Sequence, residues 1–387
     1  MKCVEKYKEK YNEDALDVSF CPYRVCPIGA HSDHNLGKIT GFAIDKGIHI
    51  AYGVNNDRIE VTSLDFDGEH SWPLDVNSKE NDWADYLRGV TYYLNKDYHI
   101  TKGIKCVIEG SLPVGGLSSS AAVIIGFLVA LSKVNGIKLN KQEIIEIAYQ
   151  AERNFVGVQV GKLDQSCEVL GKKDHLLYLD TKDNSYELIE KPVNMKAFDI
   201  LVFYSGLEHS LVSSGYNNRV SELKEAAAML ADFAGIKKEN VLCRDVPRSV
   251  FDTYKDQLPE NLRLRATHWY DEFDRVEKGA EAFKNGDIEE YGRLSFESGY
   301  SSINNWQTGA PEQIKLYELM KQTKGIYGGR FSGAGFKGCC IALADPKYTD
   351  EIIKEISEGY TKAFPNLKDK FAAYVCKSSN GVILWNV

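Results

Sequence analysis

Apolar and polar positions along the chain predict a mixture of helices and short strands. Residues 104–109 are expected to form a strand that leads into a glycine-containing loop, and the apolar run 121–131 to form a buried helix. Asn140 is a good N-cap and Glu143 stands where a capping box places an acid. A second helix is therefore expected to run from this cap to about residue 155.

Further strands are expected at 175–180 and 197–204, and a helix with a charged face at 216–233. Near the end of the chain, residues 339–344 and 371–376 are predicted to be strands that pair with each other. Strands and helices are mixed without a regular βαβ spacing, so the pattern favours an α+β fold over a doubly wound sheet. No Pro- or Ser-rich linker separates two halves, and any two domains must share an extensive contact.

Composition narrows the classes of function. The 387 residues carry a net charge of -8, which gives no basic footprint for nucleic acid. The nine cysteines include no C-x-x-C pair, which argues against a disulfide framework or zinc ribbon and favours the reducing cytoplasm. The charged N-terminus does not resemble a signal peptide, and the 11-residue apolar run 121–131 is too short to span a bilayer. We therefore expect neither nucleic-acid nor membrane partners.

The most informative stretch is residues 113–122, which reads Pro-Val-Gly-Gly-Leu-Ser-Ser-Ser-Ala-Ala. Free N–H groups at a helix N-terminus attract anions, and glycine lets the backbone come close to them. Ser120 stands where its hydroxyl could reach a metal held by phosphates. The alternative is a Ser-rich N-cap after a glycine turn, and the Walker pattern G-x-x-x-x-G-K-[ST] is absent from the sequence.

Two acids are candidates for chemistry. Glu152 shares a helix face with Ile145 and Tyr149, and a carboxylate on an apolar stripe is costly unless a cation meets it. That cation is either a buried Lys or Arg, or a bound Mg²⁺. Asp164 follows a short glycine-led segment, and its alternative role is N-cap of a helix over 165–170.

Two loops add polar groups. Residues 21–37 hold two prolines and two glycines among polar side chains, and can aim Arg24, His31 and Asp33 at one small ligand. A metal cluster of His31, Asp33 and His34, or an ordinary surface turn, are the alternatives. Residues 333–338 match G-x-G-x-x-G, but they precede a strand and not a helix, so a dinucleotide site is disfavoured. Alternatively, this glycine loop supports a neighbouring phosphate site.

Taken together, the order of these motifs resembles the GHMP small-molecule kinases, and among them the galactokinase branch. The likeness covers nearly the whole chain and rests on residues 23–37, 113–121, 151–165 and 333–339, with further similarity around Trp83 and at 216–219. It implies a two-lobed fold, with an N-terminal lobe (1–190) that contains a left-handed βαβ crossover and a ferredoxin-like C-terminal lobe (191–387). ATP and sugar are expected to meet between the lobes.

The resemblance also implies roles for individual residues. Ser120 and Glu152 are expected to hold Mg²⁺, and Trp83 to lie near the adenine. Asp164 is expected to take the proton from the anomeric hydroxyl, while Arg24 favours the ionised carboxylate. The phosphates are expected to be wrapped by Gly115, Gly116, Leu117, Ser118, Ser119 and Ser120. The sugar is expected to be contacted by His31, Asp33, Gly161 and Tyr216.

One departure bears on the substrate. Galactokinases have Glu where this chain has Ala30, and that Glu is expected to bind the C6 hydroxyl. Two like charges about 4 Å apart repel by ~1 kcal/mol in water and ~4 kcal/mol at an intermediate dielectric, so Ala30 permits a C6 carboxylate that Glu would penalise. Residues 22–31 match the P-Y-R-x-C-P-x-G-A-H pattern of galacturonokinases almost completely. Lys162 stands where galactokinases have an apolar residue, and either supplies positive charge near the carboxylate or faces solvent.

The expected reaction is therefore ATP-dependent phosphorylation of the C1 hydroxyl of D-galacturonate, with D-galactose as the alternative substrate. A pentose or 6-deoxy sugar also tolerates Ala30, but arabinose and fucose kinases keep the first motif less closely. A catalytically silent sugar sensor is disfavoured because residues 118–120, Glu152 and Asp164 are intact. A mevalonate-type or homoserine-type kinase is disfavoured by the sugar loop 24–35.

Overall fold

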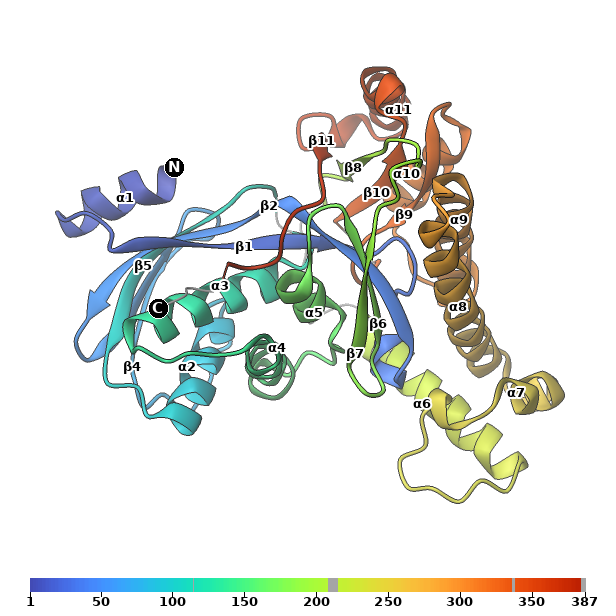
Figure 1. The fold of residues 1–387 in the computed structure, drawn as a ribbon, viewed down its shortest axis with the longest axis horizontal. Helices are drawn as coiled ribbons and strands as arrows, with labels where there is room; N and C mark the ends of the chain where they lie inside the picture. The colour runs from blue at the N-terminus through green and yellow to red at the C-terminus, as the bar shows by residue number, and fades with distance from the viewer. Residues whose placement is uncertain (114, 208–214, 336–337, 384–387) are drawn as a thin grey trace.

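A computed structural model describes residues 1–113, 115–207, 215–335 and 338–383. Its strands form two separate sheets, the larger across the left and centre of the view in Figure 1 and the smaller toward its top, with helices packed around both. Mixed helices and largely antiparallel strands confirm the predicted α+β class.

The first sheet follows the order β4-β3-β5-β2-β6-β7, with β1 paired to β2. Among the described strands, β3 and β5 make the one parallel pairing. The 18-residue β2 crosses the middle of the molecule (Figure 1) and pairs with β6 at its start and with β1 and β5 beyond. The strands are β1 Asp17–Val25, β2 Lys38–Asn55, β3 Arg58–Ser63, β4 Glu69–Pro73, β5 Gly103–Gly110, β6 His175–Asp180 and β7 Ser185–Glu190.

Helices of the N-terminal half pack against this sheet, and α3 is buried on almost every side. This burial explains the uninterrupted apolar run and confirms the predicted buried helix. Asn140 caps α4 through a complete capping box with Glu143, also as predicted. The chain stays helical to Val156, but its last turn widens into a π-helix. The elements are α1 Lys2–Tyr11, α2 Asp85–Tyr98, α3 Ser119–Val134, α4 Lys141–Gln150, π-helical Ala151–Val156 and α5 Leu163–Leu170.

The second sheet follows the order β11-β8-β10-β9, and all its pairings are antiparallel. The prediction that 339–344 and 371–376 pair with each other is wrong: both strands form, but β8 lies between them. The six residues of β8 are all buried, and this strand takes a neighbour on each edge. The strands are β8 Asp199–Tyr204, β9 Ile326–Phe331, β10 Cys339–Ala344 and β11 Ala372–Cys376.

Two long helices connect the sheets. α8 packs against β2, β6 and β7 of the first sheet, and α9 packs against β9 of the second (Figure 1). A Cβ at Gly328 would collide with the Gly292 carbonyl, so α9 and β9 touch backbone to backbone. The helices of this half are α6 Tyr216–Phe233, α7 Arg248–Tyr254, α8 Glu260–Lys284, α9 Ile288–Asn304, α10 Pro311–Gln322 and α11 Thr349–Ala363. Short 3-10 turns lie at Asp33–Asn35, Cys243–Asp245, Lys255–Gln257, Pro346–Tyr348 and Pro365–Leu367.

After β11 the chain returns to the first sheet, where the Lys377 carbonyl accepts a hydrogen bond from the Asp45 amide. All nine cysteines are free and buried. In the described part of the chain, no helix combines the length and the apolar character that a membrane crossing needs. The left-handed crossover, the ferredoxin-like character of the second lobe and the division between residues 190 and 191 stay predictions.

Candidate active site

The predicted phosphate loop connects β5 to the N-terminus of α3. Gly115 and Gly116 adopt φ values of 137° and 84°, which L side chains rarely tolerate. The late glycine loop packs directly on them: a Cβ at Gly333 would lie 2.9 Å from Cα of Gly116, and one at Gly338 would lie 2.8 Å from the carbonyl carbon of Gly115. The two glycine segments are therefore neighbours, although Val114, Phe336 and Lys337 lie outside the described residues.

The serines of the loop do not behave as an ordinary helix cap. Ser118 holds the N-cap position with a φ of 64°, but its side chain makes no capping hydrogen bond. Its hydroxyl is buried, makes no hydrogen bond of ordinary geometry among the described residues, and lies close enough to the Glu168 carboxyl to lower the pKa of that group. Ser119 is the first residue of α3, and the buried Leu117 offers its carbonyl to the Arg24 amide at 3.3 Å. The loop thus leaves polar groups available for a ligand.

Ser120 and Glu152, the two predicted magnesium ligands, contact each other. The Ser120 hydroxyl donates a 2.8 Å hydrogen bond to Oε1 of Glu152, and the Gln165 amide donates a 2.7 Å bond to Oε2. Glu152 is 1% exposed and lies in the π-helical turn, a distortion that is frequent at functional sites. Burial, followed by the negative charge of Asp164, raises the pKa of Glu152 to about 7.

This pair fits a magnesium ion. Hydroxyl and carboxylate oxygens are the hard ligands that Mg²⁺ prefers, and within the described residues no Lys or Arg forms an ion pair with Glu152. No group of three or more Asp, Glu, His or Cys side chains in the same part of the chain is arranged to hold a metal. The remaining ligands would therefore come from ATP phosphates and water, as is usual for Mg²⁺ at nucleotide sites.

Asp164 faces Arg24 and does not cap its helix. α5 begins at Leu163, so Asp164 lies inside the first turn and the N-cap position belongs to Lys162. Nε of Arg24 donates to Oδ1 of Asp164 at 2.7 Å, and Nη1 donates to the Gly116 carbonyl at 3.0 Å. The guanidinium, which is 4% exposed, joins the candidate base to the phosphate loop.

Several of the predicted sugar residues lie close to one another, next to the start of α5. Oδ2 of Asp33 accepts a 3.2 Å hydrogen bond from the Leu163 amide, and a Cβ at Gly161 would collide with the same carboxylate. The ring of His31 is 6.0 Å from that of Tyr216, the first residue of α6. His31 is buried, and its Nε2 has no partner among the described residues.

Lys162 points away from Asp164. Its Nζ lies 2.9 Å from Oε2 of Glu146 and 5.3 Å from the ring centroid of Tyr149. Lys162, Asp33 and Gly161 border a cleft of about 970 Å³ whose opposite wall includes residues of α6. Lys162 therefore borders this cleft and is paired with an acid of α4.

Trp83 belongs to an aromatic cluster. Its ring stacks on Phe66 with centroids 5.8 Å apart and meets the edge of His70 at 5.0 Å. The indole N–H is buried without a partner in the described part of the chain. Its place beside adenine stays a prediction.

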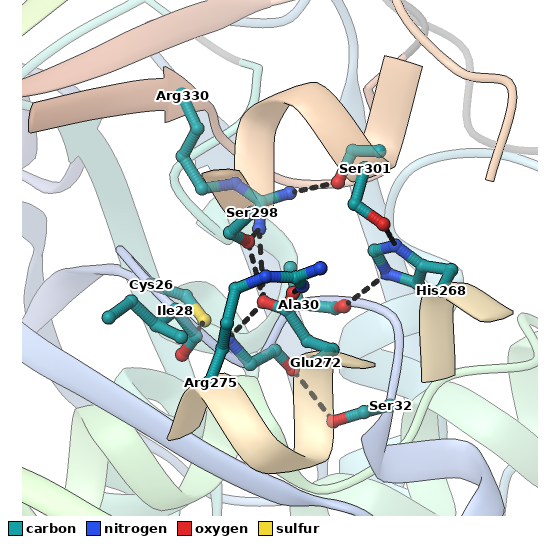
Figure 2. Close-up of polar contacts among 12 residues, drawn as sticks. Cys26, Ile28, Ala30, Ser32, His268, Glu272, Arg275, Ser298, Ser301 and Arg330 are labelled. Atoms are coloured by element: carbon teal, nitrogen blue, oxygen red, sulfur yellow. Dashed lines mark hydrogen bonds and ion pairs between the residues drawn. The ribbon is translucent and has the colours of Figure 1, made fainter. Parts of the chain in front are cut away.

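Several residues of the site were not predicted from the sequence. Gln165 orients Glu152, and Trp306 stacks on His31 with centroids 5.3 Å apart and planes 9° apart. His268 and Glu272 of α8 contact the backbone around Ala30, which is 7% exposed (Figure 2). One signal was available: Arg265, His268, Glu272 and Arg275 recur at helical spacing on one face of an otherwise amphipathic segment.

Comparison with known proteins agrees with this geometry. Residues 85–172 match the model of the GHMP kinases N terminal domain, and residues 280–362 match the GHMP kinases C terminal model. The chain is 36% identical to a galacturonokinase of Arabidopsis thaliana, over 94% of this chain and 92% of that protein. It is 32% identical to a galactokinase of Roseiflexus sp., over 98% and 95% respectively.

Solved structures give the same assignment. The structure of Lactococcus lactis galactokinase complexed with galactose superposes with a TM-score of 0.89 at 27% identity, and covers 99% of this chain and 98% of that one. Mevalonate kinase of Methanococcus jannaschii shares the fold, with a TM-score of 0.66 at 18% identity over 94% and 98% of the two chains. The chain therefore belongs to the GHMP kinase superfamily, as a galactokinase-like sugar 1-kinase that uses ATP to phosphorylate a galactose-like sugar.

Proposed function

We propose that the sugar is D-galacturonate, and that the products are galacturonate 1-phosphate and ADP. The observation that carries this proposal is Ala30, which stands where galactokinases have a Glu for the C6 hydroxyl. Without that negative charge, a C6 carboxylate meets no like charge from residue 30. The 36% identity to the Arabidopsis galacturonokinase, against 32% to the Roseiflexus galactokinase, supports the same choice.

In the proposed reaction Asp164 accepts the proton of the anomeric hydroxyl while that oxygen bonds to the γ-phosphorus of ATP. The bond from this phosphorus to the ADP oxygen breaks, and ADP leaves with the electron pair. The 2.7 Å hydrogen bond from Arg24 orients the Asp164 carboxylate, which accepts the proton in this reaction. Since Arg24 also reaches the Gly116 carbonyl, its charge acts close to the phosphates that the loop would bind.

We propose that Ser120 and Glu152 hold Mg²⁺ and that Gln165 orients the Glu152 carboxylate. When bound, the ion neutralises phosphate charge during transfer. Residues 115–120 would bind the phosphates through backbone N–H groups at the start of α3. His31, Asp33, Gly161, Lys162 and Tyr216 would surround the sugar, and Trp83 would lie beside the adenine.

D-galactose is the second candidate substrate. The galactokinases of Roseiflexus and of Lactococcus lactis align over nearly the whole chain, and the Lactococcus lactis structure contains galactose. An alanine at position 30 removes a contact to a C6 hydroxyl without blocking it sterically. Galactose turnover at reduced efficiency is therefore compatible with the same site.

An ATP-consumption assay with galacturonate, glucuronate, galactose, arabinose and fucose tests the proposal. Galacturonate is expected to give the highest kcat/KM, and glucuronate to be disfavoured because it differs at C4. The proposal is overturned if galactose or a sugar without a C6 substituent is the better substrate. Product analysis by ³¹P NMR then checks that the phosphate is on C1.

We further propose the division into lobes 1–190 and 191–387, a left-handed crossover in the first, and a ferredoxin-like second lobe. The succession β8, helices, β9, β10, α11, β11 in the order β11-β8-β10-β9 supports the last of these. Nine free cysteines support the proposal that the enzyme works in the cytoplasm.

A further inference from the structure

The turn that carries Ala30 and His31 is held by one face of α8. Oε1 of Glu272 accepts a 2.6 Å hydrogen bond from the Gly29 amide, and Nε2 of His268 lies 3.1 Å from the Ala30 carbonyl (Figure 2). The neighbouring Trp269 donates its indole N–H to the carbonyl of Ser32 at 3.0 Å. Since His268 and Glu272 are four residues apart, both side chains project from the same side of the helix.

Glu272 is a buried carboxylate inside a network of donors. It is 0% exposed; besides the Gly29 amide, its Oε1 accepts a 2.5 Å bond from the Ser298 hydroxyl, and its Oε2 is paired with Arg275. Nη1 of Arg330 lies 3.8 Å from Oε1. Burial alone would raise the pKa of Glu272, but the charges of Arg275 and Arg330 and the hydrogen bond from Ser298 lower it below its usual value. The carboxylate is therefore ionised when it holds the turn.

The network is itself anchored in the second half of the chain. Arg330, on β9, donates to the Ser298 hydroxyl at 2.5 Å and to the Ser302 hydroxyl at 3.0 Å, both on α9. Three elements, α8, α9 and β9, thus meet around Glu272. A rigid support of this kind fixes an accepting oxygen to a narrow range of positions.

His268 has a defined donor and acceptor. Burial lowers the pKa of His268 to about 4, so the ring is neutral at physiological pH. A carbonyl only accepts, so Nε2 carries the proton toward Ala30, and Nδ1 accepts from the Ser301 hydroxyl at 2.9 Å. The Ala30 carbonyl therefore sets the tautomer of His268, and the Ser301 hydroxyl holds the ring from its other nitrogen.

The backbone of the 29–31 turn is also constrained by β2 and by Ser32. Gly29 adopts a φ of 107°, and a Cβ there would lie 2.7 Å from Cα of Ile39. The Ser32 hydroxyl donates back to the Gly29 carbonyl at 2.8 Å. The backbone of Ala30 and His31 is thus set between β2 and the α8 face.

We propose that Glu272 and His268 are positioning residues for the sugar: they fix the backbone of the 29–31 turn, and so set sugar affinity and the choice between C6 substituents. The inference rests on the proposed function in one respect, namely that Ala30 and His31 face the sugar. It assigns part of the sugar specificity to a helix whose side chains support the sugar-binding turn from behind. ATP binding, which the proposed function gives to residues 115–120, is expected to be independent of this network.

The test is steady-state kinetics of Glu272→Gln in the full-length enzyme. The amide keeps the shape of Glu272 but loses the charge that pairs with Arg275 and Arg330. The KM for galacturonate is expected to rise about tenfold or more, while the KM for ATP stays within about twofold of wild type. The kcat/KM ratio of galacturonate to galactose is expected to fall toward one.

Asp199→Asn is the matched control, because Asp199 is a buried acid of β8 paired with Lys377 and bonded to Thr349. It is expected to lower the thermal midpoint without changing either KM. A role of Glu272 in general stability alone predicts the same pattern for Glu272→Gln. Unchanged sugar KM and unchanged sugar ratio in a folded Glu272→Gln enzyme overturn the proposal.

Ser301→Ala provides a second, milder variant, which decides the question if Glu272→Gln does not fold. It removes the hydroxyl that donates to Nδ1 of His268 and changes no charge. The galacturonate KM is expected to rise about three- to tenfold. No change in this KM also overturns the proposal. The test is separable from the substrate assignment: if galactose is the better substrate of the wild type, the same KM effects are expected for galactose.

Discussion

Nε of Arg24 lies 2.7 Å from Oδ1 of Asp164, and this ion pair joins the end of β1 to the first turn of α5. The same guanidinium reaches the Gly116 carbonyl of the phosphate loop at 3.0 Å. One buried cation therefore contacts both the proposed proton acceptor and the loop proposed to hold the phosphates. The two functions of the site are therefore linked through Arg24.

Asp164→Ala is expected to lower kcat by about 10²- to 10⁴-fold, the usual contribution of a general base. ATP affinity is expected to be retained, because the substitution leaves Arg24 in place and removes a negative charge near the phosphates. A coupled assay measures the loss of turnover, and calorimetry measures the retained affinity for ATP. Asp14→Ala, which removes an exposed partner of Lys8, is the control; near-normal kcat in Asp164→Ala would refute the assigned role.

Ala30→Glu is expected to lower kcat/KM for galacturonate by between about fivefold and several hundredfold, the range set by like-charge repulsion at different dielectrics. It is expected to raise kcat/KM for galactose by restoring a partner for the C6 hydroxyl. Ala30→Gln has nearly the same size without the charge and separates the two causes. If both variants lose galacturonate activity equally, the size of the side chain at position 30, and not its charge, determines whether galacturonate is accepted.

Glu152→Gln is expected to raise the Mg²⁺ concentration for half-maximal activity by about tenfold or more, because a neutral amide replaces an ionised ligand. Titration with Mn²⁺ or Mg²⁺ in the presence of a non-hydrolysable ATP analogue measures the affinity of the site for the metal without turnover. The thermal midpoint checks that the variant folds. Unaltered metal affinity would exclude Glu152 as a ligand.

Glu168 gives a prediction on stability. It is fully buried, and the nearby Ser118 hydroxyl makes no hydrogen bond of ordinary geometry to it. Burial, followed by the charge of Asp164, raises its pKa well above 4.5, although Ser118 acts in the opposite direction. Above about pH 4.5 the unfolded chain releases this proton while the folded chain keeps it, so the folded state loses stability as pH rises toward the raised pKa.

Glu168→Gln removes that loss. Its thermal midpoint is expected to exceed that of wild type at about pH 8, and the difference is expected to shrink as the pH falls toward about 4.5. Calorimetric scans across this range measure both curves. Parallel curves would mean that Glu168 does not titrate as its burial requires.

Local patterns predicted much of the fold and of the site. The run 121–131 became α3, and Asn140 and Glu143 formed the expected capping box, because both depend on neighbours in the sequence. Ser120 with Glu152, and Arg24 with Asp164, could be predicted through the family motifs. Strand partners could not: a period-2 pattern identifies the buried face of residues 339–344 but does not identify β8 as the neighbour.

The support of the 29–31 turn by α8 could not be predicted from the sequence, for a related reason. Charged residues at helical spacing, such as Glu272 and Arg275, are usually solvent-exposed, and Glu272 is buried because α8 packs against α9 and against the 29–31 turn. Lys162 was equally ambiguous, because nothing in its neighbourhood of sequence indicates the pairing with Glu146. Long-range packing decides such cases.

The support of the 29–31 turn by α8 also has a consequence for biosynthesis. Gly29 and Glu272 are 243 positions apart, so the turn leaves the ribosome long before its acceptor is made. Chains emerge N-terminus first, and contacts of this separation form late. Nascent chains that end before α8 are therefore expected to lack a formed sugar pocket, and newly made enzyme acquires its substrate recognition only when the second half of the chain has folded onto the first.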